Sequence, residues 1–216
     1  MTYNGGMLAG SVLDSVLNVA DQTLRTLFAP ARTARQPELP ADSGSLTPGE
    51  RRHAAGLMRV NHAGEIAAQG LYRGQAALSR SSSTREFLER AAGEESDHLA
   101  WCESRLRELG SRPSWLNPLW YVGSFGLGVA AALLGDAVSL GFVTETEAQV
   151  EGHLAGHLDR LPAADERSRR IVEIMKQEES GHGQAARAGG AATLPAPIPT
   201  LMRAAARVMT GTAYWL

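Results

Sequence analysis

Two segments far apart in the chain share one pattern: Glu, Glu, Ser, any residue, then His. The first is residues 94–98 (EESDH) and the second is residues 178–182 (EESGH). In each, the second Glu lies three residues before the His, and on an α-helix this spacing places both side chains on one face. A carboxylate and an imidazole that converge in this way can bind one metal ion. The repeat therefore predicts two matching half-sites. One consists of Glu95 and His98, and the other consists of Glu179 and His182.

A third Glu-x-x-His pair, Glu50 with His53, does not belong to this pattern. It follows Thr47 and Pro48, which are typical of the cap and the first position of a helix. At 1.5 Å of helix rise per residue, His53 would stand about 18 Å from Glu65, the next carboxylate along that helix. We therefore leave this pair out of the predicted metal site.

Two Glu-x-x-His helices are half of a known arrangement, in which two further helices of a bundle each contribute one inward-pointing Glu to a pair of metal ions. In the first long helix, Glu65 is the only carboxylate among residues 58–75, and small residues flank it. Burying such a lone acid is costly unless a cation accompanies it. The third long helix offers three candidates, and spacing alone does not choose among Glu145, Glu147 and Glu151.

The charges and donor atoms of this set indicate which metals it suits. Four carboxylates carry four negative charges, which two divalent ions balance. A site with two imidazoles and no thiolate favours iron or manganese over zinc or copper(I). We expect Glu95 and Glu179, the acids of the two repeats, to bridge the two ions.

The elements that must position these residues are all helical. Ala, Leu, Glu and Arg are abundant, and β-branched runs are few. We predict an all-α, four-helix bundle with extra terminal helices, and a division into an N-terminal amphipathic segment with a linker (1–45) and a main domain (46–216). The expected helices are 11–28, 48–78, 83–109, 123–160, 165–188 and 200–213, with a Pro- and Ser-rich linker at 29–45.

Residues 119–143 form an unusually apolar stretch with Asp136 as their single charge. The stretch is long enough to cross a bilayer, but five glycines, Asp136 and the acidic sequence that follows speak against a span. Two other interpretations stay open: a buried core helix, or a helix that lies on or partly in a membrane surface. Trp115, Trp120 and Tyr121 at its start resemble an interfacial aromatic anchor.

The overall totals exclude several classes of function. With 216 residues the chain has room for one domain with a substantial core. A formal net charge of −2 and the lack of a basic face argue against nucleic acid as a partner. The single cysteine, Cys102, excludes an internal disulfide, and the N-terminus lacks the basic region of a secretory signal, so we expect a cytosolic start.

Several segments, in this order and spacing, resemble the demethoxyubiquinone hydroxylase family, whose members are ferritin-like di-iron enzymes of ubiquinone biosynthesis. The resemblance covers about residues 46–216 and rests on LMRVNHAGEIAAQGLYRGQ, EESDHLAW, RPSWLNPLWYVGSFGLG, TETEAQVEGHLAGHL and EESGHGQAA. In that family the third-helix ligand is the Glu six residues before a helical His. The resemblance thus selects Glu147, ahead of His153, and implies the ligand set Glu65, Glu95, His98, Glu147, Glu179 and His182.

The resemblance also implies a function. It implies a di-iron monooxygenase with two iron ions per chain, which hydroxylates the ring of a polyprenylated demethoxyubiquinol with O2 and a reductant. The protein would then associate peripherally with the cytoplasmic face of the bacterial inner membrane, with a homo-oligomer or a ubiquinone-biosynthesis complex as further partners. The alternative is a ferritin-like iron-binding or peroxide-scavenging protein, which would not need the apolar stretch 119–143.

Some neighbours of the predicted ligands have expected roles of their own. Asp97 and Glu178 adjoin ligands and are candidates for orienting the imidazoles, although solvated helix faces explain them equally well. His153 points away from Glu147 on a 3.6-residue helix, which makes it a candidate for the substrate approach rather than a ligand. We expect Tyr72 to be part of the bundle core.

Overall fold

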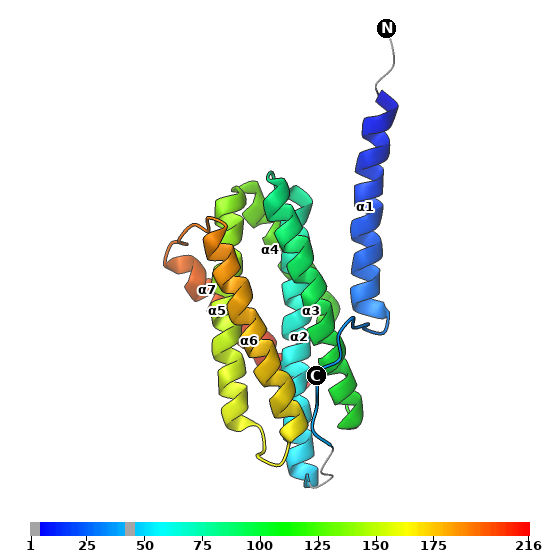
Figure 1. Ribbon diagram of the computed structural model, residues 1–216, viewed down its shortest axis with the longest axis vertical. Helices are drawn as coiled ribbons and strands as arrows, with labels where there is room; N and C mark the ends of the chain where they lie inside the picture. The colour runs from blue at the N-terminus through cyan, green and yellow to red at the C-terminus, as the bar shows by residue number, and fades with distance from the viewer. Residues whose placement is uncertain (1–4, 42–45) are drawn as a thin grey trace.

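The computed structural model describes residues 5–41 and 46–216, and within these ranges it contains α-helices and no strands. The all-α, ferritin-like bundle with additional helices is confirmed (Figure 1). The helices are α1 (Gly5–Phe28), α2 (Pro48–Leu78), α3 (Ser82–Glu108), α4 (Asn117–Leu133), α5 (Asp136–Arg160), α6 (Glu166–Ala188) and α7 (Pro197–Ala213).

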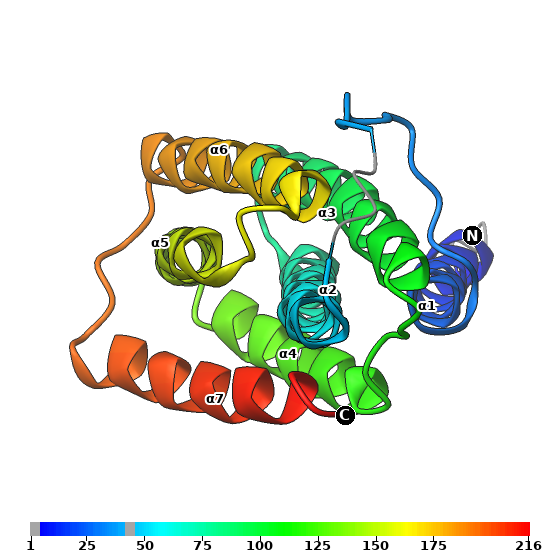
Figure 2. The same ribbon diagram turned by 90° about the horizontal axis from the view of Figure 1, so that it is seen from below.

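The helices lie in three layers when the molecule is viewed along the bundle (Figure 2). α3 and α6 form one layer and α2 and α5 the next, and these four make the bundle. α4 and α7 lie on the opposite side of α2 and α5, while α1 stands at the flank of the molecule and extends beyond it (Figure 1). The four-helix bundle thus has one covered face and one face formed by α3 and α6.

Local sequence signals set the ends of the bundle helices. Thr47 and Glu50 form a reciprocal capping box at the start of α2. Ser81 caps α3 and Asp165 caps α6, each by accepting a hydrogen bond from the backbone three residues later. These caps fix the start of three bundle helices and so fix the depth at which their acidic residues enter the core.

The third predicted helix, 123–160, is wrong as a single element. The chain breaks at Gly135, whose φ of 108° is a conformation that favours glycine, and α4 and α5 lie on either side. Asp136, the lone charge of the apolar stretch, begins α5 and accepts hydrogen bonds from Ser79 Oγ (3.0 Å), Arg80 N (3.1 Å) and Ser81 N (2.7 Å). Asp136 therefore ties the α4–α5 break to the turn between α2 and α3.

The apolar stretch 119–143 is neither a wholly buried helix nor a span. No helix among the described residues is long and apolar enough to cross a membrane. One face of α4 packs on α2, and its other face leaves large apolar side chains in solvent: Leu119, Val122, Leu127 and Leu133. The expectation of a buried core helix therefore holds for one face of α4 only.

α1 is held to the bundle by polar contacts. Thr23 lies 3.0 Å from the Tyr121 hydroxyl, and the Thr26 hydroxyl donates to Gln69 Oε1 at 2.8 Å. On this helix, which was expected to be amphipathic, Leu27 packs partly against the core, whereas three other large apolar side chains are exposed: Leu17, Leu24 and Phe28. From Leu17 onward, where the structure describes every side chain of α1, its apolar side chains are therefore mostly exposed.

Two glycines of α4 differ in the space around them, and this difference gives a first prediction. A Cβ at Gly128 would collide with the backbone carbonyl of Leu71 in α2, whereas a Cβ at Gly126 meets nothing. We expect Gly128→Ala to lower the free energy of unfolding by about 1–3 kcal/mol, because α2 and α4 must separate. Gly126→Ala should instead raise it by up to about 1 kcal/mol through helix propensity. Chemical denaturation of the two variants measures this, and equal effects would contradict close packing of α4 on α2.

Residues 29–41, which we name the strap, were expected only to link α1 to α2. They instead run along the α3 side of the bundle (Figure 2). Ala34 N donates to Asp97 Oδ1 at 2.7 Å, and the Trp101 indole N–H donates to Arg35 O at 2.8 Å. The strap is therefore fixed to α3 at the helical turn that carries His98.

Candidate metal centre

The six predicted ligands converge between the four bundle helices, and all of them are buried. Their ligand atoms form two groups, each with all atoms within 4.8 Å of one another. Each group contains one glutamate of its own, from α2 or α5, and one of the two histidines. Two further glutamates belong to both groups. The groups are Glu65, Glu95, His98 and Glu179, and Glu95, Glu147, Glu179 and His182.

The shared residues are Glu95 and Glu179, the acids of the two repeated motifs. His98 Nδ1 lies 3.0 Å from Glu95 Oε2 and 3.1 Å from Glu179 Oε1. His182 Nδ1 lies 3.2 Å from the other Glu95 oxygen and 3.4 Å from the other Glu179 oxygen. Each of these two carboxylates thus turns one oxygen toward each histidine, so each could bind a metal ion beside either imidazole.

The buried atoms of the centre fit metal ions better than they fit one another. Glu95 Oε1 and His182 Nδ1 are buried and make no hydrogen bond within the described part of the chain, although they lie 3.2 Å apart. Four carboxylates buried together repel one another strongly unless cations separate them. The set contains no thiolate, because Cys102 lies beside Met175 Sδ at 3.8 Å. This group of oxygen and nitrogen donors can therefore hold metal ions.

Glu65 and Glu147, which each belong to only one group, have raised pKa values in the absence of metal. Burial raises the pKa of Glu65 well above its usual value, and the charge of Glu95 adds to the shift. Burial likewise raises the pKa of Glu147, with Glu179 as the next cause. Protons and metal ions therefore compete for these two carboxylates, and metal affinity is expected to fall as the pH falls.

The two imidazoles respond in the opposite sense. Burial alone would lower the pKa of His98, but hydrogen bonds to Glu178 and Glu179 outweigh it and raise the pKa well above the usual value. Burial also opposes the shift at His182, where the close carboxylates of Glu179 and Glu95 raise the pKa to about 12. Without metal the imidazoles thus serve as the cations of the centre, and a bound metal ion would take the place of the proton on each Nδ1.

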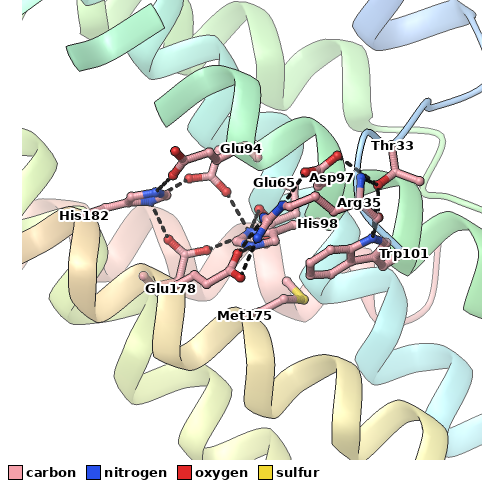
Figure 3. Close-up of polar contacts among 12 residues, drawn as sticks. Thr33, Arg35, Glu65, Glu94, Asp97, His98, Trp101, Met175, Glu178 and His182 are labelled. Atoms are coloured by element: carbon pink, nitrogen blue, oxygen red, sulfur yellow. Dashed lines mark hydrogen bonds and ion pairs between the residues drawn. The ribbon is translucent and has the colours of Figure 1, made fainter. Parts of the chain in front are cut away.

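The repeated motifs explain how each imidazole is held (Figure 3). α3 and α6 run in opposite directions, and the first Glu of each motif reaches the His of the other. Glu178 Oε2 lies 2.8 Å from His98 Nε2, and Glu94 Oε2 lies 2.5 Å from His182 Nε2. A carboxylate that accepts the Nε2–H leaves the Nδ1 lone pair for a metal ion. Both glutamates of the motif therefore have a place at the centre.

Three expectations for neighbouring residues have different outcomes. Glu178 contacts an imidazole, which is one of the two interpretations left open for it, whereas Asp97 instead binds the strap. Tyr72 is fully buried as expected, and its hydroxyl also donates to Glu147 Oε1. Glu94 was missed, although its position as the first Glu of the motif repeats that of Glu178 and was a usable signal.

A cavity of about 620 Å³ lies between α2, α5 and α7 and reaches Glu65. Most of its wall surface is apolar, and the polar residues that line it include His153, Arg203 and Arg207. Of the three helices that line the cavity, α7 lies on the side of α2 and α5 that faces away from α3 and α6 (Figure 2). The described apolar wall residues are Val60, Ala148, Val150, Leu154, Ala206 and Met209.

Comparison with known proteins gives the family. The family model described as "Ubiquinone biosynthesis protein COQ7" matches residues 52–213. This chain belongs to the COQ7 family. Among its relatives, the 3-demethoxyubiquinol 3-hydroxylase of Bordetella avium is 56% identical over 100% of both chains. That of Burkholderia ambifaria is 56% identical over 95% of this chain and 100% of its own, and that of Cupriavidus pinatubonensis is 55% identical over 94% and 99%.

Membership of the COQ7 family makes the protein a hydroxylase, and hence an oxidoreductase, of ubiquinone biosynthesis. The family match includes all six residues of the metal centre and His153, whereas the strap at 29–41 lies outside it. The strap contributes Arg35, whose guanidinium binds both oxygens of Glu178 at 2.9 Å. Sequence reasoning missed this residue, because a Pro-rich composition predicts only that the segment is not helical.

Proposed function

We propose that this protein hydroxylates the ring of a polyprenylated 3-demethoxyubiquinol, using O2, a reductant and two iron ions. The observation that carries the proposal is the position of the apolar cavity, whose inner wall includes Glu65 of the metal centre. Its volume of about 620 Å³ suits a ring with the first part of a hydrophobic tail. The name shared by the full-length relatives supports the same substrate.

In this proposal the six residues hold the iron ions in two positions. Glu65 and His98 would hold the first ion, Glu147 and His182 would hold the second, and Glu95 and Glu179 would bind both. Bound iron supplies the electron-transfer chemistry that reduces O2. The chain itself orients the imidazoles through Glu94 and Glu178 and keeps bulk water from the centre, because the ligands are buried.

His153 is proposed to orient the substrate ring. Its Nε2 is buried and has no hydrogen-bond partner among the described residues, although the side chain lines the cavity. Burial lowers the pKa of His153, and the charge of Arg160 lowers it further, so the imidazole is neutral near pH 7. A neutral imidazole can hydrogen bond to a ring hydroxyl or methoxy oxygen without carrying charge into the cavity. This interaction would fix which ring carbon faces Glu65.

The substrate tail suggests why the molecule exposes apolar surface. Exposed apolar residues occur on α4 and α7, the two helices on the cavity side of the bundle (Figure 2). Leu119, Val122 and Leu127 project from α4, and Leu201 and Val208 project from α7. We propose that this side rests on lipid as a peripheral contact, at the cytoplasmic face of the inner membrane, so that the tail need not cross water.

The alternative function is that of a ferritin-like iron-binding or peroxide-scavenging protein. Such a protein would share the six donors but would have no use for an apolar cavity beside them or for the exposed apolar face of α4. The hydroxylase accounts for both features, and it also agrees with the names of the relatives. It is therefore the function that we favour.

Organic extraction of the purified protein, together with metal analysis, tests the choice. We expect a polyprenyl quinone of the demethoxy type to co-purify, and we expect two iron ions per chain. Addition of the reduced quinone, O2 and a reductant should then yield the hydroxylated ring, as detected by mass spectrometry. An iron content far above two per chain, or peroxide consumption without ring hydroxylation, would favour the alternative.

A further inference from the structure

Each histidine of the metal centre contacts a glutamate through Nε2, but the two glutamates differ in their own ion pairs. Glu178, the partner of His98, accepts hydrogen bonds from Nη1 and Nη2 of Arg35, one on each carboxylate oxygen and each at 2.9 Å. Glu94, the partner of His182, has no ion pair within the described residues other than the one with that histidine. The Glu94 side chain is 42% exposed, compared with 28% for Glu178. The support behind His98 is thus the firmer of the two.

Arg35 is itself fixed in place by α3 (Figure 3). Its Nε donates to Asp97 Oδ2 at 2.8 Å, while the other Asp97 oxygen accepts from the Thr33 hydroxyl at 2.8 Å and from Ala34 N at 2.7 Å. Trp101 binds the Arg35 carbonyl and lies beneath its guanidinium, 5.4 Å from the ring centre. The guanidinium therefore joins Asp97 of α3 to Glu178 of α6, one residue away from His98 and Glu179.

We propose that Arg35 is a positioning residue, through which the strap fixes His98 and makes the first metal position bind more firmly than the second. The inference rests on the proposed function, because it assumes two metal positions. A two-pronged guanidinium–carboxylate contact fixes direction as well as distance. Glu178 held in this way keeps the His98 imidazole in one orientation, with Nδ1 toward Glu95 and Glu179. The Glu94–His182 pair lacks such a support, so the orientation of the His182 imidazole is less restricted.

Titration of the metal-free protein with Mn(II) tests this without any reliance on activity. The free ion is counted by its electron paramagnetic resonance signal. The unaltered chain should bind two ions with unequal affinities. Arg35→Ala should weaken the firmer position by about 10- to 100-fold, the range found when a residue supporting a metal ligand is removed, and should leave the other nearly unchanged. Arg35→Lys should also weaken it, since one ammonium group cannot hold Asp97 and Glu178 together.

Control variants separate positioning from general loosening of the fold. Arg32→Ala alters an exposed arginine of the same strap that forms no ion pair in the described structure, and it should bind Mn(II) like the unaltered chain. Glu178→Gln should reproduce the effect of Arg35→Ala, and the double variant should lose no more than either single one. Glu94→Gln should weaken the other position instead.

The outcomes distinguish this inference from the proposed function. If the unaltered chain binds fewer than two Mn(II) ions, the two-metal centre itself is wrong. If it binds two, but Arg35→Ala and Arg35→Lys bind both ions normally or weaken both equally, the positioning role is wrong. Loss of folding in Arg35→Ala, seen by circular dichroism, would leave Arg35→Lys to decide between these results.

Discussion

Glu95→Ala is expected to remove both metal ions and to lower hydroxylation by about 1,000-fold or more. The reason is that Glu95 belongs to both ligand groups and turns one oxygen toward each histidine. Glu65→Ala, which alters a residue of one group only, should retain one ion per chain. Metal analysis and a single-turnover hydroxylation assay on both variants measure the difference.

The matched control for this prediction is Glu89→Ala. Glu89 lies on α3, like Glu95, but its side chain is exposed and forms no hydrogen bond or ion pair in the described structure. The variant should keep two ions and normal turnover. Retention of two ions and full activity in Glu95→Ala would refute the shared-ligand arrangement, whereas a loss in Glu89→Ala would show that the assay reports on general damage.

Gly152→Leu is expected to lower turnover by about 100-fold while leaving the metal content unchanged. Gly152 lines the cavity next to His153, and a Cβ there meets no other atom, so a larger side chain can enter the cavity. The added leucine would occupy the space proposed for the substrate ring and misplace it relative to Glu65. Steady-state kinetics, iron analysis and quinone extraction on the variant measure the three effects.

Gly156→Leu provides the comparison for this second prediction. Gly156 lies one turn further along α5, also has space for a Cβ, and is not part of the cavity wall. Both substitutions gain the same helix propensity, about 0.8–1 kcal/mol, so stability is matched. Gly156→Leu should turn over normally with quinone bound. Equal activity of the two leucine variants would contradict the assignment of this cavity to the substrate.

The Glu-x-x-His residues of the candidate centre were predictable because their spacing along the sequence alone places them on one helix face. A Glu three residues before a His on one helix face needs no knowledge of the tertiary fold, and its repetition indicates a second equivalent helix. The choice of Glu147 over Glu145 and Glu151 depended on resemblance to a family. In the structure Glu145 pairs with Arg203 at the surface, whereas Glu147 lies in the core.

Other features depend on contacts between distant segments and could not be read from local sequence. Five glycines in residues 119–143 were each able to end a helix. Gly135 does so because Asp136, next to it, accepts hydrogen bonds from the α2–α3 turn, which lies more than 50 residues earlier. Glu94 can likewise contact His182 only because α3 and α6 are antiparallel and their two motifs lie at the same level of the bundle. Arg35 becomes part of the centre only after the strap binds Asp97.

Diffraction from crystals of the iron-loaded protein, measured on both sides of the iron absorption edge, tests the central claim most directly. The account predicts two anomalous peaks about 3.5–4 Å apart, between the four bundle helices, with Glu95 and Glu179 in contact with both. A single peak, or iron bound outside the six buried side chains, would contradict it.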